Sequence, residues 1–287
     1  MSDDLTLAAT TPPRGAPRAR RLLPKRSSVA SLLVLLALAL VWEGAKAVFG
    51  ISDQKLPHLL AIFGEFGTRT RGGAGPVLAV AMFENAVVTF GEALFGFALG
   101  GLLGCTLAVV FASSRLLERG LLPFVVGSQT VPILAIAPMV VVGLGRLGAP
   151  DLLSKAVVAA YLTFFPVTIG MLRGLRSVPP DALSLMRSYA ASAGQTFWKL
   201  RLPAALPYLF TSLKVAATAS VIGAIVAELP AGSKNGIGVT ILNATQYYNS
   251  RPPVLYAAVL VAGAIGLLFY GIVALAERLI IRERKAE

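Results

Sequence analysis

Long apolar runs, separated by short polar or basic segments, dominate the sequence. A helix of about 20 apolar residues crosses a bilayer core about 30 Å thick, and only helices or closed barrels satisfy their own backbone there. The apolar runs lack the period-two alternation that the strands of a barrel need. The pattern therefore predicts an all-α transmembrane fold with six spans, at about residues 29–49, 86–112, 121–145, 152–172, 203–229 and 254–275.

Composition supports this interpretation and excludes several soluble classes. Of 287 residues, 56% are hydrophobic and 14% are charged, whereas soluble domains carry about 25% charged residues. The mean hydropathy is +0.75. One cysteine, Cys105, excludes an intrachain disulfide, and with a single histidine, His58, a zinc cluster is excluded as well. Most soluble-enzyme classes are therefore excluded, and we expect no catalytic residues, metal or cofactor in this chain.

The basic residues indicate topology. The net charge is +12, but the charges lie between apolar runs instead of forming one basic face, so nucleic acid is not expected as a partner. With the N-terminus inside, 17 of the 26 Lys and Arg residues fall on the cytoplasmic side and 8 on the outer side. Because basic loops are retained in the cytoplasm, both termini are predicted to be cytoplasmic.

Two regions outside the spans are less informative. Residues 1–28 are rich in Pro, Arg and Ala without hydrophobic periodicity, which predicts a disordered basic tail ahead of a permease domain at 29–285. A cleaved signal peptide is disfavoured, because its apolar core would be too long. Between the first two spans, the apolar stretch 59–66 is expected to lie flat at the outer interface.

The segment 173–202 is too polar to span a membrane, and its pattern predicts a structured cytoplasmic element. Pro179-Pro180-Asp181 is typical of a helix start, and this helix should run to about Ala191. Ser192 and Gln195 have the spacing of a capping box, which predicts a second short helix at 195–200. The fifth span should then start at Leu202-Pro203, because proline is tolerated in a first helical turn.

An apolar stripe on the first of these helices needs to be covered. Leu183, Met186 and Ala190 share one face, and Leu185 pairs with Tyr189 beside it. Physical chemistry leaves two interpretations open: the helix pair rests on the lipid interface, or a protein partner docks on it.

The residues of this segment resemble a known family. Arg187-Ser188-Tyr189-Ala190-Ala191-Ser192, followed by Gln195 to Pro207, is similar to the conserved cytoplasmic loop of binding-protein-dependent ABC importer permeases, most of all the nitrate/sulfonate/taurine branch. The family pattern is Glu-Ala-Ala, three residues, Gly, nine residues, Ile, one residue, Leu-Pro. Aligned on Leu202-Pro203, its Gly falls on Ala190 and its Glu-Ala-Ala on 184–186, so the glutamate and the glycine are replaced here.

The resemblance implies a type I importer permease of the bacterial inner membrane, with 173–202 as the loop that couples it to an ATPase. The implied partners are two cytoplasmic ATP-binding subunits that carry ATP and Mg, a second permease copy, an extracytoplasmic solute-binding protein and membrane lipid. This chain has no Gly-x-x-x-x-Gly-Lys-Ser/Thr phosphate loop, which agrees with a separate ATPase. The implied coupling residues are Arg187, Tyr189, Ala190, Ser192, Gln195 and Pro203.

Polar residues inside the spans are candidates for the translocation path. Glu92 lies on one helical face with Asn85 and Thr89, and an ionisable group in a span should face a cavity or a partner such as Lys214. On the same face, Gly96, Gly100 and Gly104 favour plain helix packing. Prolines 132 and 138 leave the carbonyls of residues 128 and 134 without donors, so they either line a cavity or are satisfied by packing. The candidates for the path are Thr89, Glu92, Gln129, Thr130, Lys214 and Glu228.

The solute and one rival mechanism remain open at this point. The resembling family carries oxyanions, sulfonates and aromatic vitamin precursors. If Glu92 and Glu228 line the path, they repel a small oxyanion, which favours a neutral or organic solute, such as a sulfonate or a pyrimidine- or flavin-like precursor. The alternative is an ion-coupled secondary transporter that works without an ATPase and uses these two glutamates as protonation sites.

Overall fold

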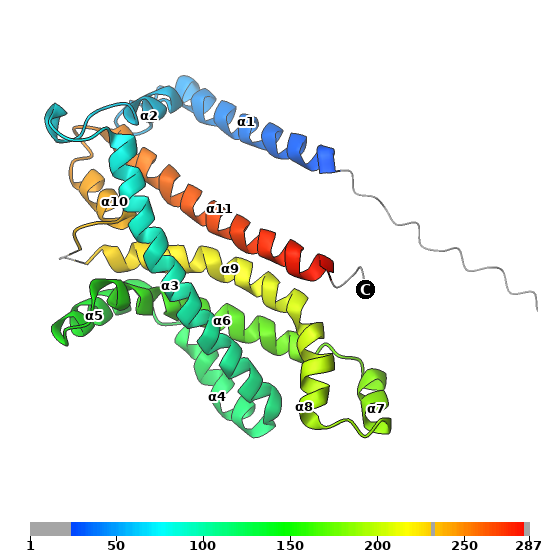
Figure 1. Ribbon diagram of the computed structural model, residues 1–287. Coiled ribbons are helices and arrows are strands. Elements are labelled where there is room, and N and C mark those ends of the chain that lie inside the picture. The colour runs from blue at the N-terminus through cyan, green and yellow to red at the C-terminus, as the bar shows by residue number, and fades with distance from the viewer. Residues whose placement is uncertain (1–23, 231–232, 284–287) are drawn as a thin grey trace, which may run out of the picture. The chain divides into compact units, whose positions relative to one another are not determined.

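The computed structural model describes residues 24–230 and 233–283, and helices dominate this part of the chain (Figure 1). The chain forms two compact units, Met1–Ile51 and Ser52–Glu287. The described part of the first unit is a single helix, α1 (Pro24–Phe49), which begins before the expected start of the first span at residue 29. The rest of the expected disordered tail, residues 1–23, lies outside the described residues.

The second unit confirms the all-helical class. Its long helices are α3 (Leu78–Ser113), α6 (Asp151–Leu175), α9 (Leu202–Glu228) and α11 (Pro252–Glu283). Within the described residues we find no β-strand, only an isolated bridge between Arg69 and Val77. The shorter helices are α2 (Leu59–Glu65), η1 (Arg71–Gly73), α4 (Arg115–Ser128), α5 (Ile133–Arg146), α7 (Pro180–Ser188), α8 (Ala193–Thr196), η2 (Phe197–Arg201) and α10 (Ile237–Gln246).

The predicted third span, 121–145, is not one straight helix. It is divided between α4 and α5, which meet at an angle of 94° across residues 129–132. The break falls at Pro132, which has extended backbone angles and cannot continue α4. Pro138, by contrast, lies inside α5. One of the two expected proline kinks is therefore a full break, and the other leaves its helix intact.

The predicted fifth span starts earlier than Leu202-Pro203. Helical backbone continues from Ala193 to Glu228, because η2 is a wide π-type turn in which the Leu202 N–H donates to the carbonyl of Phe197. A π-turn inserts one residue into the helix, so the turn ahead of Pro203 is widened where the proline cannot donate. The coupling loop and the fifth span thus share one continuous helix.

Helices α3, α6 and α9 pack against one another through small residues (Figure 1). A Cβ added to Gly100 would lie 2.6 Å from the Ala160 carbonyl oxygen, and one added to Gly104 would lie 2.6 Å from that of Phe164. At Gly223 on α9, an added Cβ would lie 2.6 Å from the Cα of Ala159. The predicted helix-packing role of the glycine stripe is confirmed, because only glycine allows backbones to approach this closely.

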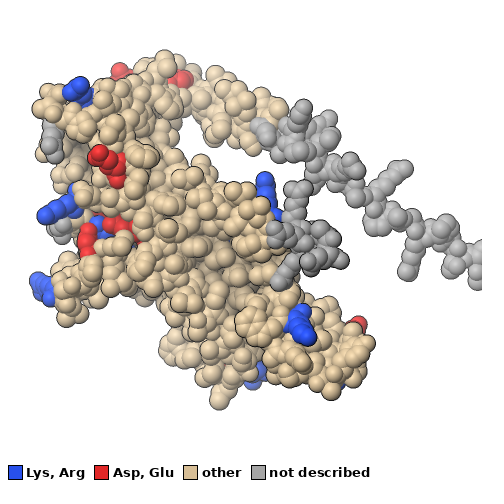
Figure 2. All heavy atoms as spheres, viewed as in Figure 1, with Lys and Arg blue, Asp and Glu red and all other residues tan. Residues whose placement is uncertain are grey.

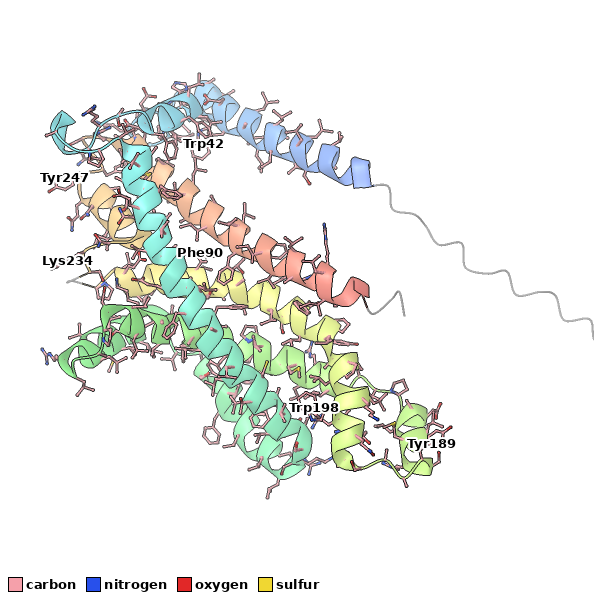
Figure 3. All side chains as sticks on the ribbon, in the orientation of Figure 1. Trp42, Phe90, Tyr189, Trp198, Lys234 and Tyr247 are labelled. Atoms are coloured by element: carbon pink, nitrogen blue, oxygen red, sulfur yellow. The ribbon has the colours of Figure 1, made fainter. Side chains whose placement is uncertain are left out.

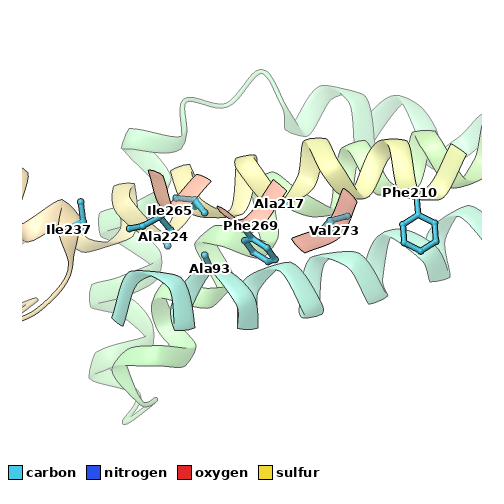
Figure 4. Packing of buried hydrophobic residues seen from close by; sticks show 9 residues of the cluster. Ala93, Phe210, Ala217, Ala224, Ile237, Ile265, Phe269 and Val273 are labelled. Carbon is cyan, nitrogen blue, oxygen red and sulfur yellow. The ribbon is translucent and has the colours of Figure 1, made fainter. Parts of the chain in front are cut away.

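An aromatic group closes the packing between α3, α9 and α11. Phe269 of α11 is buried, and the rings of Phe90 and Phe97 lie 5.2 and 5.0 Å from its ring in tilted arrangements. Such geometry is favourable because ring edges then meet ring faces. Figure 4 shows Phe269 beside small residues from α3 and α9, including Ala93 and Ala217. Small residues leave the space that the ring fills.

The outer surface of the helices is apolar. Five helices are long and apolar enough to cross a membrane, and a sixth span results if α4 and α5 count as one. Figure 2 shows broad uncharged areas along the helices, with charged side chains gathered toward their ends. The exposed residues include Phe83, Leu102, Ile222 and Leu267. A surface of this kind suits contact with lipid, because in water it would favour aggregation.

Candidate functional site

Polar residues gather at two places in the second unit. One is a buried polar cluster, defined by Asn85, Thr89 and Glu92 of α3, Lys155 of α6 and Glu228 of α9. The other is the coupling loop, residues 173–202, at the opposite end of the continuous helix that runs from Ala193 to Glu228. Figure 1 shows α7 and α8 at one end of α9 and α10 near the other.

The first half of the buried polar cluster is an ion pair between helices. The Lys155 ammonium lies 2.8 Å from Oε1 of Glu92, and the two side chains are 1% and 3% exposed. The same ammonium lies 2.8 Å from Oδ2 of Asp151, one turn earlier on α6. Taking charges out of water is costly unless they are paired and hydrogen-bonded, so Lys155 supplies the cation that a buried carboxylate at this position needs.

The second half of the cluster holds the backbone that leads into α10. The Thr89 hydroxyl donates to Oε1 of Glu228 over 2.6 Å and accepts from the N–H of Ile237 over 2.9 Å. The other carboxylate oxygen of Glu228 accepts from the N–H of Gly238. Gly236 N–H donates to the Asn85 side-chain oxygen over 2.8 Å. The orphan N–H groups at the start of α10 are thus satisfied by side chains of α3 and α9.

Glycine is required where this backbone passes Glu228. Gly236 has φ of +124°, and a Cβ there would collide with the Glu228 carboxyl group. A Cβ on Gly238 would lie 2.9 Å from Oε2 of Glu228. The carboxylate therefore sits in a pocket formed by backbone, which only glycine leaves open.

Asn85 explains why α3 begins before the predicted start of the second span at residue 86. The side-chain amide of Asn85 donates to the Ala81 carbonyl over 2.9 Å, while its oxygen accepts from Gly236. A polar residue with both ends bonded is compatible with a helix interior. The helix therefore extends back to Leu78.

Lys214 is not the partner of Glu92, contrary to the sequence expectation. Its ammonium lies 2.7 Å from Oε2 of Glu277 on α11, and the two side chains are 19% and 23% exposed. The helical face of Lys214 points toward α11 rather than α3. The structure therefore separates Lys214 from Thr89, Glu92 and Glu228, the candidates for the path that lie in the buried polar cluster.

Gln129 and Thr130 lie at the break between α4 and α5 rather than inside a span. The Thr130 hydroxyl donates to the Gly127 carbonyl over 2.7 Å, and the Gln129 amide donates to the Ser128 hydroxyl over 3.3 Å. The Ser128 carbonyl, which Pro132 deprives of its helical donor, accepts from the Tyr161 hydroxyl of α6. The packing interpretation of Pro132 is therefore the one that the structure supports.

The coupling loop is held by local motifs. The first helix, α7, begins at Pro180 as predicted but ends at Ser188 instead of about Ala191. Ala190 has a left-handed backbone with φ of 50°, while Ala191 N–H bonds to Met186 O and Ala190 N–H to Arg187 O, both at 2.9 Å. This is a Schellman motif, in which the left-handed position favours glycine.

The predicted capping box is confirmed. The Ser192 hydroxyl accepts from Gln195 N–H over 3.2 Å, and the Gln195 side chain accepts from Ser192 N–H over 2.9 Å. The helix that follows begins at Ala193 rather than at residue 195. A folded turn of this kind presents its side chains in one defined arrangement, because both neighbouring helix ends are capped.

Large side chains on this loop are exposed. Tyr189 is 77% exposed and Trp198 is 68% exposed (Figure 3). Leu185 is exposed as well, so the outward apolar face of α7 is the Leu185–Tyr189 pair. Leu183 and Met186 are half-buried and face the body of the unit. Of the predicted coupling residues, Pro203 alone lies away from this turn, inside α9, while the exposed ones are Arg187, Tyr189, Ala190, Ser192 and Gln195.

These features define a class of protein: a multi-span helical permease with a structured loop at one end of its bundle. The chain belongs to the family described as "Binding-protein-dependent transport system inner membrane component", whose pattern matches residues 96–282. It is therefore a membrane-spanning permease subunit of the ABC importer type, for a small solute.

Relatives in several bacteria agree with this assignment. The chain is 31% identical over 241 residues to a probable ABC transporter permease protein of Haemophilus influenzae, covering 83% of this chain and 91% of that one. It is 29% identical over 270 residues to the riboflavin transport system permease protein RibX of Chloroflexus aurantiacus, covering 94% and 96%. It is 28% identical over 255 residues to the formylaminopyrimidine transport permease protein ThiX of Halalkalibacterium halodurans, covering 89% and 96%.

Solved structures confirm the fold. An amino acid ABC transporter superposes with a TM-score of 0.57 at 15% identity, covering 70% of this chain and 94% of that one. The MetNI methionine ABC transporter, in an inward-facing conformation, gives 0.54 at 18% identity, covering 72% and 95%.

Sequence reasoning missed Lys155 and the backbone of Gly236 and Gly238. Lys155 lies in an apolar run with Asp151 four residues before it. The rule that selected Glu92, that an ionisable residue in a span needs a partner, also applies to Lys155 and would have found it. The glycines gave no such signal, because the need for them arises from Glu228 in another element.

Proposed function

We propose that this chain forms the translocation path of an ATP-driven importer and that its coupling loop docks into a cytoplasmic ATPase. The observation that carries the proposal is the exposure of Leu185, Tyr189 and Trp198 on one loop. The end of α7 and the start of α8 are both capped, so the loop is ordered. Ordered aromatic residues in the open are typical of protein interfaces. Two ATPase subunits, a second copy of the permease and an extracytoplasmic solute-binding protein complete the assembly, with both termini of this chain in the cytoplasm.

The continuous helix suggests how the loop acts on the path. Residues Ala193 to Glu228 form 36 residues of helix, with a path length of roughly 54 Å at about 1.5 Å per residue, and the helix bends where α8 meets α9 (Figure 1). Glu228, at the far end, holds the start of α10 through Gly238. Movement of the docked loop would therefore be transmitted through the turn at η2 and along α9 to the buried polar cluster, as alternating access requires.

We propose that the solute is a small organic molecule without a fixed negative charge. Glu92 and Glu228 of the cluster, with Asp151 beside it, bring three carboxyl groups against the single ammonium of Lys155, which disfavours an oxyanion nearby. The relatives RibX and ThiX, whose names specify riboflavin and formylaminopyrimidine, match nearly the whole chain. Relatives named for aliphatic sulfonates and bicarbonate match less of it.

Affinity purification tests the coupling proposal. We expect the tagged chain, expressed with its neighbouring genes, to bring down a stoichiometric ATPase in mild detergent. Tyr189→Glu should abolish this association by placing a charge in the interface. Tyr247→Glu is the matched control, because Tyr247 is similarly exposed at 70% but lies at the other end of the bundle (Figure 3).

Two results would contradict the proposal. If the wild-type chain elutes alone and uptake by cells responds to uncouplers instead of to loss of ATP, the chain is an ion-coupled carrier. If Tyr189→Glu and Tyr247→Glu retain the ATPase equally, the coupling loop does not dock. The solute proposal is tested separately, by uptake of radiolabelled riboflavin, formylaminopyrimidine, taurine and nitrate by the complete transporter; uptake of nitrate alone would overturn it.

A further inference from the structure

A cavity of about 1000 Å³ lies beside the coupling loop, where α3 and α6 end. It is distinct from the buried polar cluster, which lies at the other end of α9. Ala112, near the end of α3, and Leu175, the last residue of α6, both line it. We name it the arginine pocket after its charged lining residues, which are Arg115, Arg119, Arg176, Arg201 and Glu118.

The arginine pocket has a large excess of positive charge. Both guanidinium nitrogens of Arg176 donate to the carboxylate of Glu118, so this pair is neutral. In the part of the chain that the structure describes, no carboxylate lies within ion-pair distance of Arg115, Arg119 or Arg201. Three arginines therefore line one cavity without an ion pair to any described residue, and the single carboxylate near them, Glu118, is already bonded to Arg176. Arg201 is half-buried, whereas Arg115 and Arg119 are exposed.

The remaining wall of the pocket is apolar and comes from three elements. Leu122 and Val126 belong to α4, Leu183 belongs to α7, and Val178 lies between α6 and α7. A cavity with an apolar wall and charged groups on its lining suits an amphiphile, whose charged end meets the arginines while its hydrocarbon lies along the wall. A fully soluble ion would leave most of the volume unused.

The pocket lies at the ends of two helices that can span a membrane, a location that suits contact with lipid headgroups. The pocket is lined by the ends of α3 and α6, and both helices are long and apolar enough to span a membrane. Basic pockets between transmembrane helices at this depth bind phosphorylated headgroups, because arginine forms paired hydrogen bonds with phosphate oxygens. Arg173 lies at the same end of the bundle but outside the arginine pocket. It is exposed on the last turn of α6 and lines a smaller groove of about 470 Å³ that has no other charged residue.

We propose that the arginine pocket binds a phosphate group through Arg115, Arg119 and Arg201, and that an anionic phospholipid supplies this group. A bound lipid would join α4 to Arg201 of η2 through its headgroup, and its hydrocarbon would lie along Val178 and Leu183 beside the coupling loop. It would thereby hold the coupling loop against the bundle. This site is independent of the solute path and of the ATPase interface proposed above.

Native mass spectrometry of the purified full-length chain tests the proposal. We expect dioleoyl phosphatidylglycerol to be retained in preference to dioleoyl phosphatidylcholine. Arg201→Gln and Arg115→Gln should each weaken retention of phosphatidylglycerol about fivefold, since one basic residue near an anionic headgroup contributes about 1 kcal/mol. Arg173→Gln is the matched control, because it removes the same charge from the same end of the bundle outside the pocket. Arg173→Gln should leave retention of phosphatidylglycerol within about twofold of wild type. A change of this size is well below the fivefold loss expected when one headgroup contact is removed.

Competition with inorganic phosphate identifies the source of the anion. If phosphate displaces phosphatidylglycerol from the wild-type chain, the arginines bind the phosphate group itself. If phosphate binds in an Arg201-dependent manner and phosphatidylglycerol is not retained, the site belongs to a soluble anion and the lipid assignment is overturned. Equal losses in Arg173→Gln and Arg201→Gln, or equal retention of the two lipids, would overturn the site altogether. Arg201→Lys, which keeps the charge, separates lost binding from misfolding and should retain most of the lipid.

Discussion

The two ends of the continuous helix Ala193–Glu228 are stabilised in different ways. At the Glu228 end, the buried polar cluster joins residues far apart in sequence: Lys155 to Glu92, and Glu228 to Thr89. At the Ala193 end, the coupling loop is held by bonds that cross three to five residues, as in the capping box of Ser192. The first region is buried and the second is exposed.

The difference agrees with the roles proposed for the two ends, the solute path at the Glu228 end and ATPase docking at the coupling loop. Bonds between distant elements in a dry interior are strong, because water does not compete for the same groups. A loop that has to fit a partner needs a defined shape but also free side chains, and local caps supply the shape without covering them. Four substitutions test this comparison, beginning with the largest expected effect.

Lys155→Met should be the most damaging change. It leaves the buried Glu92 carboxylate without its cation, which costs about 3–5 kcal/mol. Lys214→Met is the matched control, since the Lys214–Glu277 pair is partly exposed and should contribute about 1 kcal/mol or less. Melting temperature in detergent measures both. Recovery of part of the loss in the double variant Lys155→Met/Glu92→Gln would show that the unpaired charge is the cause, and equal losses for Lys155 and Lys214 would contradict this account.

Gly100→Ala should weaken the packing of α3 against α6 and lower the stability of the bundle. The added Cβ would lie 2.6 Å from the Ala160 carbonyl oxygen, and overpacking of this kind costs about 1–3 kcal/mol. The neighbouring Gly101 has no atom within 4 Å of an added Cβ. Gly101→Ala should therefore be neutral or stabilise the helix by up to about 1 kcal/mol, by the difference in helix propensity. Opposite shifts in melting temperature are expected, and shifts of the same sign would contradict the glycine packing.

Ser192→Ala should loosen the coupling loop alone. Loss of an N-cap costs about 1 kcal/mol, and the bonds of Ser192 are local. We expect faster amide hydrogen exchange across residues 189–197 with the melting temperature of the bundle unchanged. Ser188→Ala is a suitable control, because the Ser188 hydroxyl bonds only the carbonyl of Leu185. A fall in the melting temperature of the whole chain would show that the two ends are not independent.

Ala190→Gly should have the smallest effect and the opposite sign. A non-glycine residue in left-handed conformation costs about 1 kcal/mol, so glycine at φ of 50° should slow exchange of the α7 amides. Ala191→Gly is the matched control. The φ of Ala191 is not positive, so glycine there only adds conformational freedom to the unfolded chain and should speed exchange. Identical behaviour of the two variants would exclude strain at Ala190.

The structure explains one departure from the family pattern and leaves the other unexplained. Ala190 stands where the family has glycine, and the left-handed backbone at this position gives the physical reason for that glycine. The chain keeps the turn through the Schellman bonds of Ala190 and Ala191 despite the alanine. The replaced Glu-Ala-Ala residues, 184–186, lie within α7, and nothing in the structure explains their change.

The sequence by itself determined what local rules and the membrane govern: the apolar spans, the start of α7 at Pro180 and the capping box at Ser192. These depend on neighbours within a few residues, or on the length that lipid imposes on any helix. Only the tertiary structure decided that Glu92 pairs with Lys155, that Tyr161 satisfies the carbonyl freed by Pro132, and that Glu228 needs Gly236 and Gly238. The partner of a buried polar group depends on which helix faces touch, and helical periodicity shows which residues share a face but not which face lies opposite.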